Sequence, residues 1–225
     1  MPGGFQVLND NGAVQIDADY MNLELHTTGS VVCSQRISNT ALQAWWQADV
    51  NITAETPVVL ATKSAASCIV WWMGVTGGVS KFRVMAETQN AHVDYFAFAP
   101  PDQTEGVLGL EVFTEDERLA FSSSKKYMRV LDIFSGADAK TQLVPSATYP
   151  GRTPAVVQSF FSKEILSRPT GPNVWQSRHS GASTRVSGPT VFFEWKMYVE
   201  EAGYGPYPNF ESPSYSYLIV DVAGM

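Results

Sequence analysis

Two stretches of this 225-residue chain alternate apolar and polar residues on both sides of a turn, and this alternation limits the possible folds most strongly. In residues 4–17 the turn is Asn-Asp-Asn-Gly at residues 9–12, and in residues 109–122 it is Glu-Asp-Glu-Arg at residues 115–118. Successive side chains of a β-strand point to opposite faces, so each stretch predicts a hairpin with one apolar face.

Shifting the first stretch by 105 positions brings the apolar residues of the two hairpins into register. The matching positions are Gly4 with Gly109, Phe5 with Leu110, Val7 with Val112, Val14 with Leu119, Ile16 with Phe121, Leu23 with Met128, and Leu25 with Val130. The match is one of pattern, so it indicates either an internal duplication or two unrelated amphipathic hairpins. A Pro-Pro break within residues 99–104 separates the repeats. We therefore expect β-rich halves at 1–103 and 104–225, as related domains or as the two sheets of one sandwich.

Further strand-like segments, rich in Val, Ile and aromatic residues, follow both hairpins. They span 31–37, 44–52, 58–61, 68–73, 81–86 and 93–99 in the first half, and 129–134, 191–200 and 215–222 in the second. Short strands at such spacing predict an all-β fold of one or more β-sandwiches with little helix. The best helix candidate spans 155–166, after Pro154 and before Pro169. Residues 168–189 and 201–214 are expected to be irregular.

The formal net charge is −7, and the 15 Lys and Arg residues are scattered along the chain. This charge argues against nucleic acid or an anionic membrane as a partner. No apolar run approaches the roughly 18 residues of a membrane span, and no secretory leader is recognisable, so we expect a soluble product made in a cytoplasm. Cys33 and Cys68 are too few for a disulfide framework and are expected to be buried thiols.

No motif points to catalysis, a cofactor or a metal. His26, His92 and His179 show no paired metal-ligand spacing, and no Gly-x-Ser-x-Gly nucleophile motif occurs. The turn at residues 9–12 resembles the start of a calcium loop, but Tyr20 stands where that loop needs a Glu. The Gly-rich residues 74–78 are interpreted as a turn and not as a phosphate loop. We expect a non-enzymatic protein; a glycan depolymerase stays open because its carboxylate pair would be joined only in the folded state.

The aromatic residues are the unusual feature of the composition. Trp45-Trp46 and Trp71-Trp72 are adjacent pairs in strand-like segments, so one Trp of each pair can enter the core while the other faces outward. An outward Trp would stack a sugar or contact a subunit; alternatively, a second sheet covers both. The candidate binding or interface residues are Trp46, Trp72, Tyr204, Tyr207 and Phe210.

The two hairpin segments also share a more specific pattern. Residues 109–113 are Gly-hydrophobe-x-Val-aromatic, and after the turn residues 119–123 (Leu-Ala-Phe-Ser-Ser) and 128–130 (Met-Arg-Val) complete it; residues 4–17 follow the same order. This pattern resembles a signature of small virion proteins of tailed bacteriophages (siphophages), associated with the tail tip and tail fibres. The second copy departs from it in its turn, where Glu-Asp-Glu-Arg replaces the usual Asn/Asp-Gly.

The resemblance implies a structural protein of the tail tip, baseplate or fibre attachment, assembled into the virion in the host cytoplasm. Its implied partners are other tail proteins and copies of itself, for example in a symmetric ring or trimer. The resemblance implies no catalytic residue. The alternative is a carbohydrate-binding module of the tail that recognises host-surface glycans through Trp46 or Trp72 and Tyr204 or Tyr207.

Overall fold

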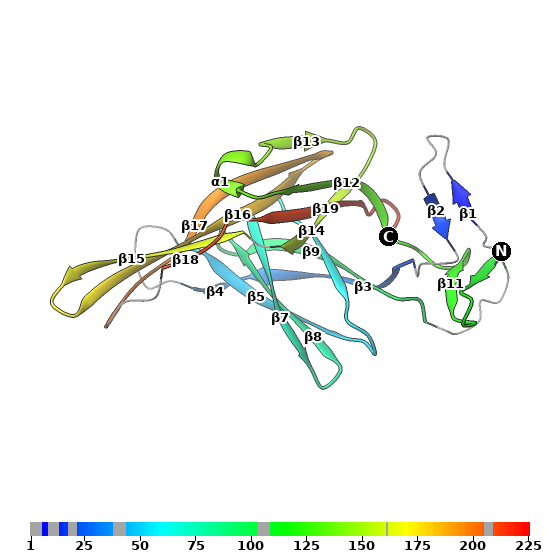
Figure 1. Ribbon diagram of the computed structural model, residues 1–225, viewed down its shortest axis with the longest axis horizontal. Coiled ribbons are helices and arrows are strands. Elements are labelled where there is room, and N and C mark those ends of the chain that lie inside the picture. The colour runs from blue at the N-terminus through cyan, green and yellow to red at the C-terminus, as the bar shows by residue number, and fades with distance from the viewer. Residues whose placement is uncertain are drawn as a thin grey trace.

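The computed structural model describes residues 6–8, 14–17, 22–37, 44–102, 109–160, 162–204 and 209–225, and these form an all-β protein (Figure 1). The helix found among them, α1, spans the four residues Ala139–Gln142, and the Asp138 side chain caps it by accepting a hydrogen bond from Lys140 N. The predicted all-β class with little helix is confirmed.

The strands form two large sheets and two separate hairpins. The hairpins are β1 (Gln6–Leu8) with β2 (Val14–Asp17), and β10 (Glu111–Phe113) with β11 (Leu119–Ser122). The first sheet has the order β12 (Arg129–Gly136), β19 (Tyr215–Asp221), β14 (Pro154–Phe160), β6 (Val59–Lys63), β9 (Ala91–Ala99), β3 (Glu24–Cys33). The second sheet has the order β13 (Ser146–Thr148), β17 (Thr190–Tyr204), β16 (Val174–Ser187), β7 (Cys68–Thr76), β8 (Val79–Ala86), β5 (Trp46–Thr53), β4 (Gln35–Arg36). Strand β15 (Lys163–Gly171) pairs with β16 and with β18 (Phe210–Ser212).

The strand order shows the same plan in both halves of the chain. From its centre outward, one side of the first sheet has the order β6, β9, β3, and the other side has the order β14, β19, β12. In the second sheet, β5-β8-β7 is matched in the same way by β13-β17-β16. The halves meet where β6 pairs with β14 and β7 with β16, so corresponding strands face each other at the centre of both sheets.

The β-bulges strengthen this correspondence. In the first hairpin Val7 pairs with Ile16 and the register shifts after Val7; in the second, Val112 pairs with Phe121 and the register shifts after Val112. The β3–β9 register shifts between Leu25 and Thr27, and the β12–β19 register between Val130 and Asp132. Each pair of bulges is 105 positions apart. The two halves therefore match in backbone geometry, at these bulges, as well as in sequence pattern.

The two ends of the first sheet meet at one corner. Met128 N donates to Leu23 O at 2.8 Å, and Leu25 N donates to Lys126 O at 2.6 Å. Leu23 and Met128 are the residues that the shift of 105 positions aligns. The sheet is therefore closed where its two equivalent edge strands begin, and both hairpins lie at this end of the molecule (Figure 1).

Each half has its own core between the two sheets. The first packs around Val50, Val70, Val84 and Val93, and the second around Val156, Phe193, Tyr217 and Ile219. Cys33 and Cys68 are buried free thiols, as predicted, and burial raises the pKa of Cys33 to about 12. The predicted boundary at residue 103 lies within 103–108, outside the described residues.

The predicted helix at 155–166 is wrong, because this segment supplies β14 and the start of β15. Ala155, Val156 and Val157 are all buried. Strand β14 lies at the centre of the first sheet and is covered on both faces, so its apolar residues run continuously and do not alternate.

The prediction of irregular structure at 168–189 and 201–214 is also wrong for the residues described. Strand β15, residues 174–181 of β16 and residues 196–204 of β17 form a long arm that projects from the sandwich, with β18 at its edge (Figure 1). Much of β15 is exposed, and its apolar side chains, Ile165 and Leu166, are adjacent and so point to opposite faces. Such a strand has no apolar alternation to detect.

Glycines allow a close approach of tyrosine at equivalent strand pairs, which gives a first prediction. A Cβ on Gly136 would lie 2.6 Å from the Tyr215 ring, and one on Gly29 would lie 2.4 Å from the Tyr95 hydroxyl. Tyr215 is buried and donates to Gln142 O, so its ring cannot move away. We expect Gly136→Ala to cost about 1–3 kcal/mol of unfolding free energy. Gly29→Ala should cost less, because the half-buried Tyr95 can shift; equal losses in urea unfolding would contradict this account.

Candidate binding site

The structure places the two tryptophan pairs differently. Trp45 is fully buried and Trp46 is half-buried against the core of the first half. Trp71 and Trp72 are both exposed, at 46% and 57%, so the prediction that one Trp of each pair enters the core is wrong for this pair. The reason is that the β7–β8 hairpin extends past the sandwich, where neither of its faces is covered (Figure 1).

The other predicted residues lie on or near the arm. Tyr204 ends β17, paired through its backbone with Val174, but its side chain and all of Tyr207 lie outside the described residues. Phe210 lies in β18 and is exposed. Phe210 lies near the β7–β8 hairpin, because Lys163 contacts the rings of both Phe210 and Trp71. Trp46 lies on the inner face of the second sheet.

A row of side chains crosses the outer face of the second sheet. Trp71 of β7 lies directly opposite Arg83 of β8, and Arg83 lies directly opposite Asp49 of β5. Opposed residues of antiparallel strands share a face, so the three side chains are neighbours. Arg83 donates two hydrogen bonds to Asp49, at 2.9 and 3.2 Å, and these lower the pKa of the Asp49 carboxyl.

The arm adds two more residues to this row. Lys163 Nζ lies 5.1 Å from the centre of the Trp71 ring and 5.0 Å from the centre of the Phe210 ring. Both distances suit an attraction between a cation and an aromatic face. We call Asp49, Arg83, Trp71, Lys163 and Phe210 the aromatic row.

Packing of the arm on the sheet determines where the row lies. The β16–β17 register shifts between His179 and Ser180, and this bulge lies where Tyr198 and Val199 pack over Trp45, Ile69 and Met85. Ile69 and Met85 are two residues from Trp71 and Arg83 along their strands. The aromatic row therefore lies next to the part of the outer face that Tyr198 and Val199 cover.

No family model, curated protein or solved structure matches this chain. Function must therefore follow from the residues and their arrangement. In the described ranges no helix is long and apolar enough to cross a membrane. Within the same residues, no three His, Cys, Asp or Glu side chains are grouped so that they could hold a metal ion.

A hollow of about 350 Å³ opens on the inner face of β7. Trp72 and Gln158 line it together with core residues such as Leu60, Val70 and Phe82. Gln158 accepts a hydrogen bond from Val70 N and donates to Cys68 O and Thr184 Oγ1. Its amide is fully engaged in joining the sheets, so this hollow is largely apolar.

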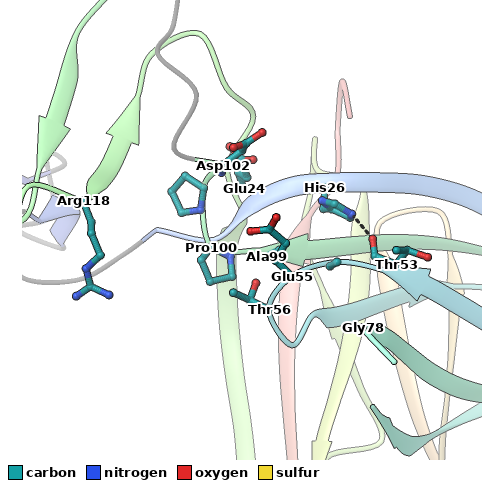
Figure 2. Close-up of a pocket in the computed structure, with 12 residues that line it drawn as sticks. Glu24, His26, Thr53, Glu55, Thr56, Gly78, Ala99, Pro100, Asp102 and Arg118 are labelled. Carbon is teal, nitrogen blue, oxygen red and sulfur yellow. Dashed lines mark hydrogen bonds between the residues drawn. The ribbon is translucent and has the colours of Figure 1, made fainter. Parts of the chain in front are cut away.

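Another hollow, of about 710 Å³, lies between the sandwich and the β10–β11 hairpin (Figure 2). Glu24 in its wall forms an ion pair with Lys125 at 2.9 Å and accepts a hydrogen bond from Asp102 N. His26 Nε2 donates to Thr53 O at 2.9 Å, and Arg118 forms an ion pair with Asp116. These contacts hold the wall of the hollow together, so we assign no ligand to it.

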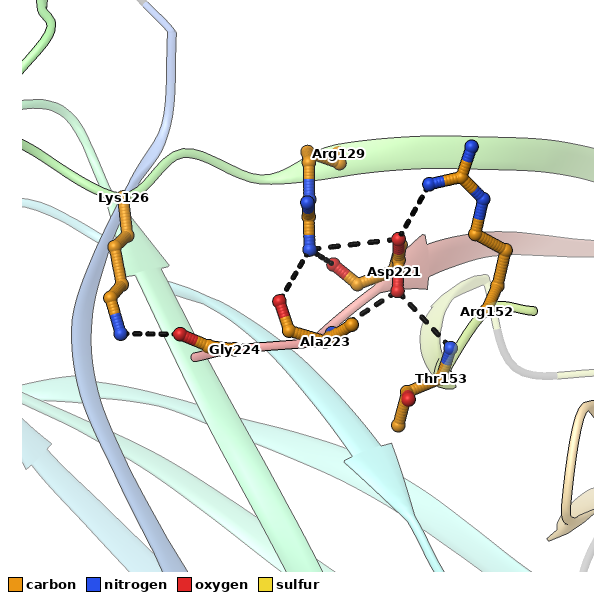
Figure 3. A network of polar contacts seen from close by, with 7 residues as sticks. All are labelled: Lys126, Arg129, Arg152, Thr153, Asp221, Ala223 and Gly224. Atoms are coloured by element: carbon orange, nitrogen blue, oxygen red, sulfur yellow. Dashed lines mark hydrogen bonds and ion pairs between the residues drawn. The ribbon is translucent and has the colours of Figure 1, made fainter.

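A polar network around Asp221 is likewise structural (Figure 3). Asp221 Oδ1 accepts hydrogen bonds from Thr153 N and Ala223 N, and Oδ2 forms ion pairs with Arg129 and Arg152 at 3.6 and 3.3 Å. The carboxylate is buried and both its oxygens have partners. It ties the C-terminal segment to the starts of β12 and β14.

The Asp221 network predicts a pH-dependent contribution to stability. Burial by itself would raise the pKa of Asp221, but the Ala223 and Thr153 N–H groups and the two arginines hold it below the ordinary value of 3.8. A lowered folded pKa gives stability that is complete above pH 3.8 and is lost as the pH falls through the folded value. We expect Asp221→Asn to cost about 2 kcal/mol at pH 7 and clearly less near pH 3, measured by urea unfolding. A cost independent of pH would contradict this role.

Proposed function

We propose that this chain is a structural, non-enzymatic component of a bacteriophage tail, at the tip, baseplate or fibre attachment, and acts by contacts with other tail proteins and with copies of itself. The supporting observation is that the two segments resembling tail proteins form hairpins of the same register and bulge, 105 positions apart. Each hairpin precedes an equivalent edge strand, β3 or β12. A repeated pattern of this kind, preserved in the backbone, is more specific than a chance amphipathic sequence.

Several elements that project from the sandwich expose apolar side chains, as a surface that binds other proteins does. Leu110 and Phe113 are exposed on and beside β10, and Trp71, Trp72 and Met73 are exposed near the end of the β7–β8 hairpin. Aromatic residues and Met are enriched in protein interfaces, and clusters of exposed apolar residues mark interaction sites. Strand β12, at an edge of the first sheet, exposes Val130 and Ile133 and could receive a strand of a partner.

The test is the composition of particles of the phage that encodes the chain. We expect mass spectrometry to detect the protein in purified virions, gold-labelled antibodies to mark the distal tail, and deletion of the gene to give particles with defective tails. Absence of the protein from virions whose infectivity survives the deletion would refute the proposal.

A second candidate function is recognition of host-surface glycans by the tail, and the exposure of Trp71 and Trp72 favours it. Exposed aromatic faces are platforms for the apolar side of a sugar ring. We expect a glycan array to show binding that Trp71→Ala or Trp72→Ala removes while the circular dichroism spectrum is unchanged. Failure to bind any glycan would leave only the structural role.

A further inference from the structure

Lys163 holds a charge that no carboxylate neutralises among the residues described. Of the described acidic side chains of the arm, Glu164 and Glu211 form ion pairs with Lys140, and Glu200 forms one with Arg178. Glu201 lies on the other side of His179 from Lys163 and forms no ion pair with it. Glu164 is adjacent to Lys163 in β15 and so points to the opposite face. The charge of Arg83 is shared with Asp49. In the aromatic row, only the charge of Lys163 is therefore left without an anion.

The surface next to this charge is open and partly hollowed. Trp71, Trp72, Met73 and Arg83 line a depression of about 270 Å³. Trp71 and Phe210, which flank Lys163, are each close to half exposed. Pockets for drug-sized ligands start at about 300 Å³, so this depression suits a single sugar ring, with the rest of a chain lying on open surface.

We propose that the aromatic row binds an acidic saccharide, with a sugar carboxylate on Lys163 and pyranose rings packed on Trp71 and Phe210. The assignment rests on the second function proposed above, glycan recognition, and does not depend on attachment to a tail. It differs from the sequence-based candidates because Trp71, Lys163 and Arg83 were not among them.

Two properties of the row select this ligand class. A carboxylate gains a charge-assisted hydrogen bond at Lys163, which a neutral sugar does not. The flat C–H face of a pyranose covers an aromatic ring, and an acidic peptide has no comparable face for both Trp71 and Phe210. Because the chain carries a net charge of −7, an acidic polymer is repelled at long range, and binding must come from local contacts.

The experiment is calorimetric titration of the full-length protein with four probes. They are a short oligogalacturonate, a short oligosialic acid, a maltooligosaccharide of equal length as the neutral probe, and poly-L-glutamate as the acidic peptide. We expect at least one acidic saccharide to bind about tenfold more tightly than the neutral one, to quench tryptophan fluorescence, and to bind more weakly as salt is raised.

Variants of the exposed row identify the site without endangering the fold. Lys163→Gln and Trp71→Ala should each weaken acidic binding about tenfold. Lys163→Arg should retain binding, because arginine keeps the charge and also stacks on aromatic rings. The matched controls are Lys63→Gln on β6 of the other sheet and Phe113→Ala, an exposed residue of β10; neither should change the affinity.

The contrary outcomes can be told apart. Equal binding of neutral and acidic saccharides, insensitive to Lys163→Gln, overturns the acidic assignment and leaves glycan recognition standing. Binding of no saccharide overturns both. Binding of poly-L-glutamate alone, lost in Lys163→Gln, assigns the row to an acidic protein partner instead. An equal loss of affinity in Lys63→Gln would show that overall charge determines binding, and would overturn the assignment of the site to the aromatic row.

Discussion

Replacing Trp45 by alanine is expected to lower the free energy of unfolding by about 3–5 kcal/mol. Trp45 is fully buried where the arm packs on the second sheet, and its ring meets that of Tyr198 edge-on, with centres 6.3 Å apart. Removing the indole leaves a cavity in the cluster that Trp45 forms with Ile69, Met85, Tyr198 and Val199, where the arm packs on the second sheet. Chemical denaturation followed by circular dichroism measures the loss.

Two further variants identify the cause of that loss. Trp71→Ala removes the same side chain from an exposed position and should change stability by less than about 0.5 kcal/mol. Trp45→Phe keeps most of the buried ring and removes an indole N–H that has no partner among the described residues, so it should cost only about 1 kcal/mol. A small loss in Trp45→Ala would mean that the arm does not depend on this contact.

Replacing Gln158 by leucine is expected to cost about 3 kcal/mol. The side chain has a similar size, but Val70 N–H loses its acceptor at 2.9 Å, and Cys68 O and Thr184 Oγ1 lose a donor at 3.2 and 3.1 Å. Each polar group left unsatisfied inside the protein costs about 1–3 kcal/mol. Because Gln158 joins the two sheets next to the contact between β7 and β16, the melting temperature should fall by about 10 °C.

The control is Gln35→Leu, at an exposed position of the short edge strand β4, which should have almost no effect. Gln158→Glu should also be destabilising at neutral pH, since its carboxylate would face the Cys68 carbonyl without a donor. A loss below 1 kcal/mol in Gln158→Leu would show that water replaces the amide and that the cross-sheet bonds contribute little.

The same strand order recurs in both halves of the chain, and two residues of the aromatic row lie on strands that depart from it. Equivalent strands meet in the middle of both sheets, so each half covers an edge that the other would leave open. Strands β15 and β18 interrupt the repeat, since they have no equivalents among the described strands of the first half. The aromatic row depends on this addition, because Lys163 and Phe210 come from these two strands.

Sequence patterns located most of the strands. The hairpins at 109–122 and 4–17 were predicted from alternation, and the other strand-like segments from their Val, Ile and aromatic content and their spacing. The pattern misled at residues 155–166, where burial on both faces gives a continuous apolar run. It gave no signal at 168–171, where β15 is exposed, or in β16, where Ser, Thr and Gly fill most of the buried positions.

The sequence by itself determined the period-two alternation and the turn residues, which depend on neighbours along the chain, and the recurrence of this local pattern 105 positions later. Only the tertiary structure decided the aromatic row. Trp71 and Lys163 are 92 positions apart, and they meet because the arm packs on the second sheet beside a bulge in β16–β17. Contacts of this kind depend on the packing of separate elements, and no periodicity of the chain encodes that distance.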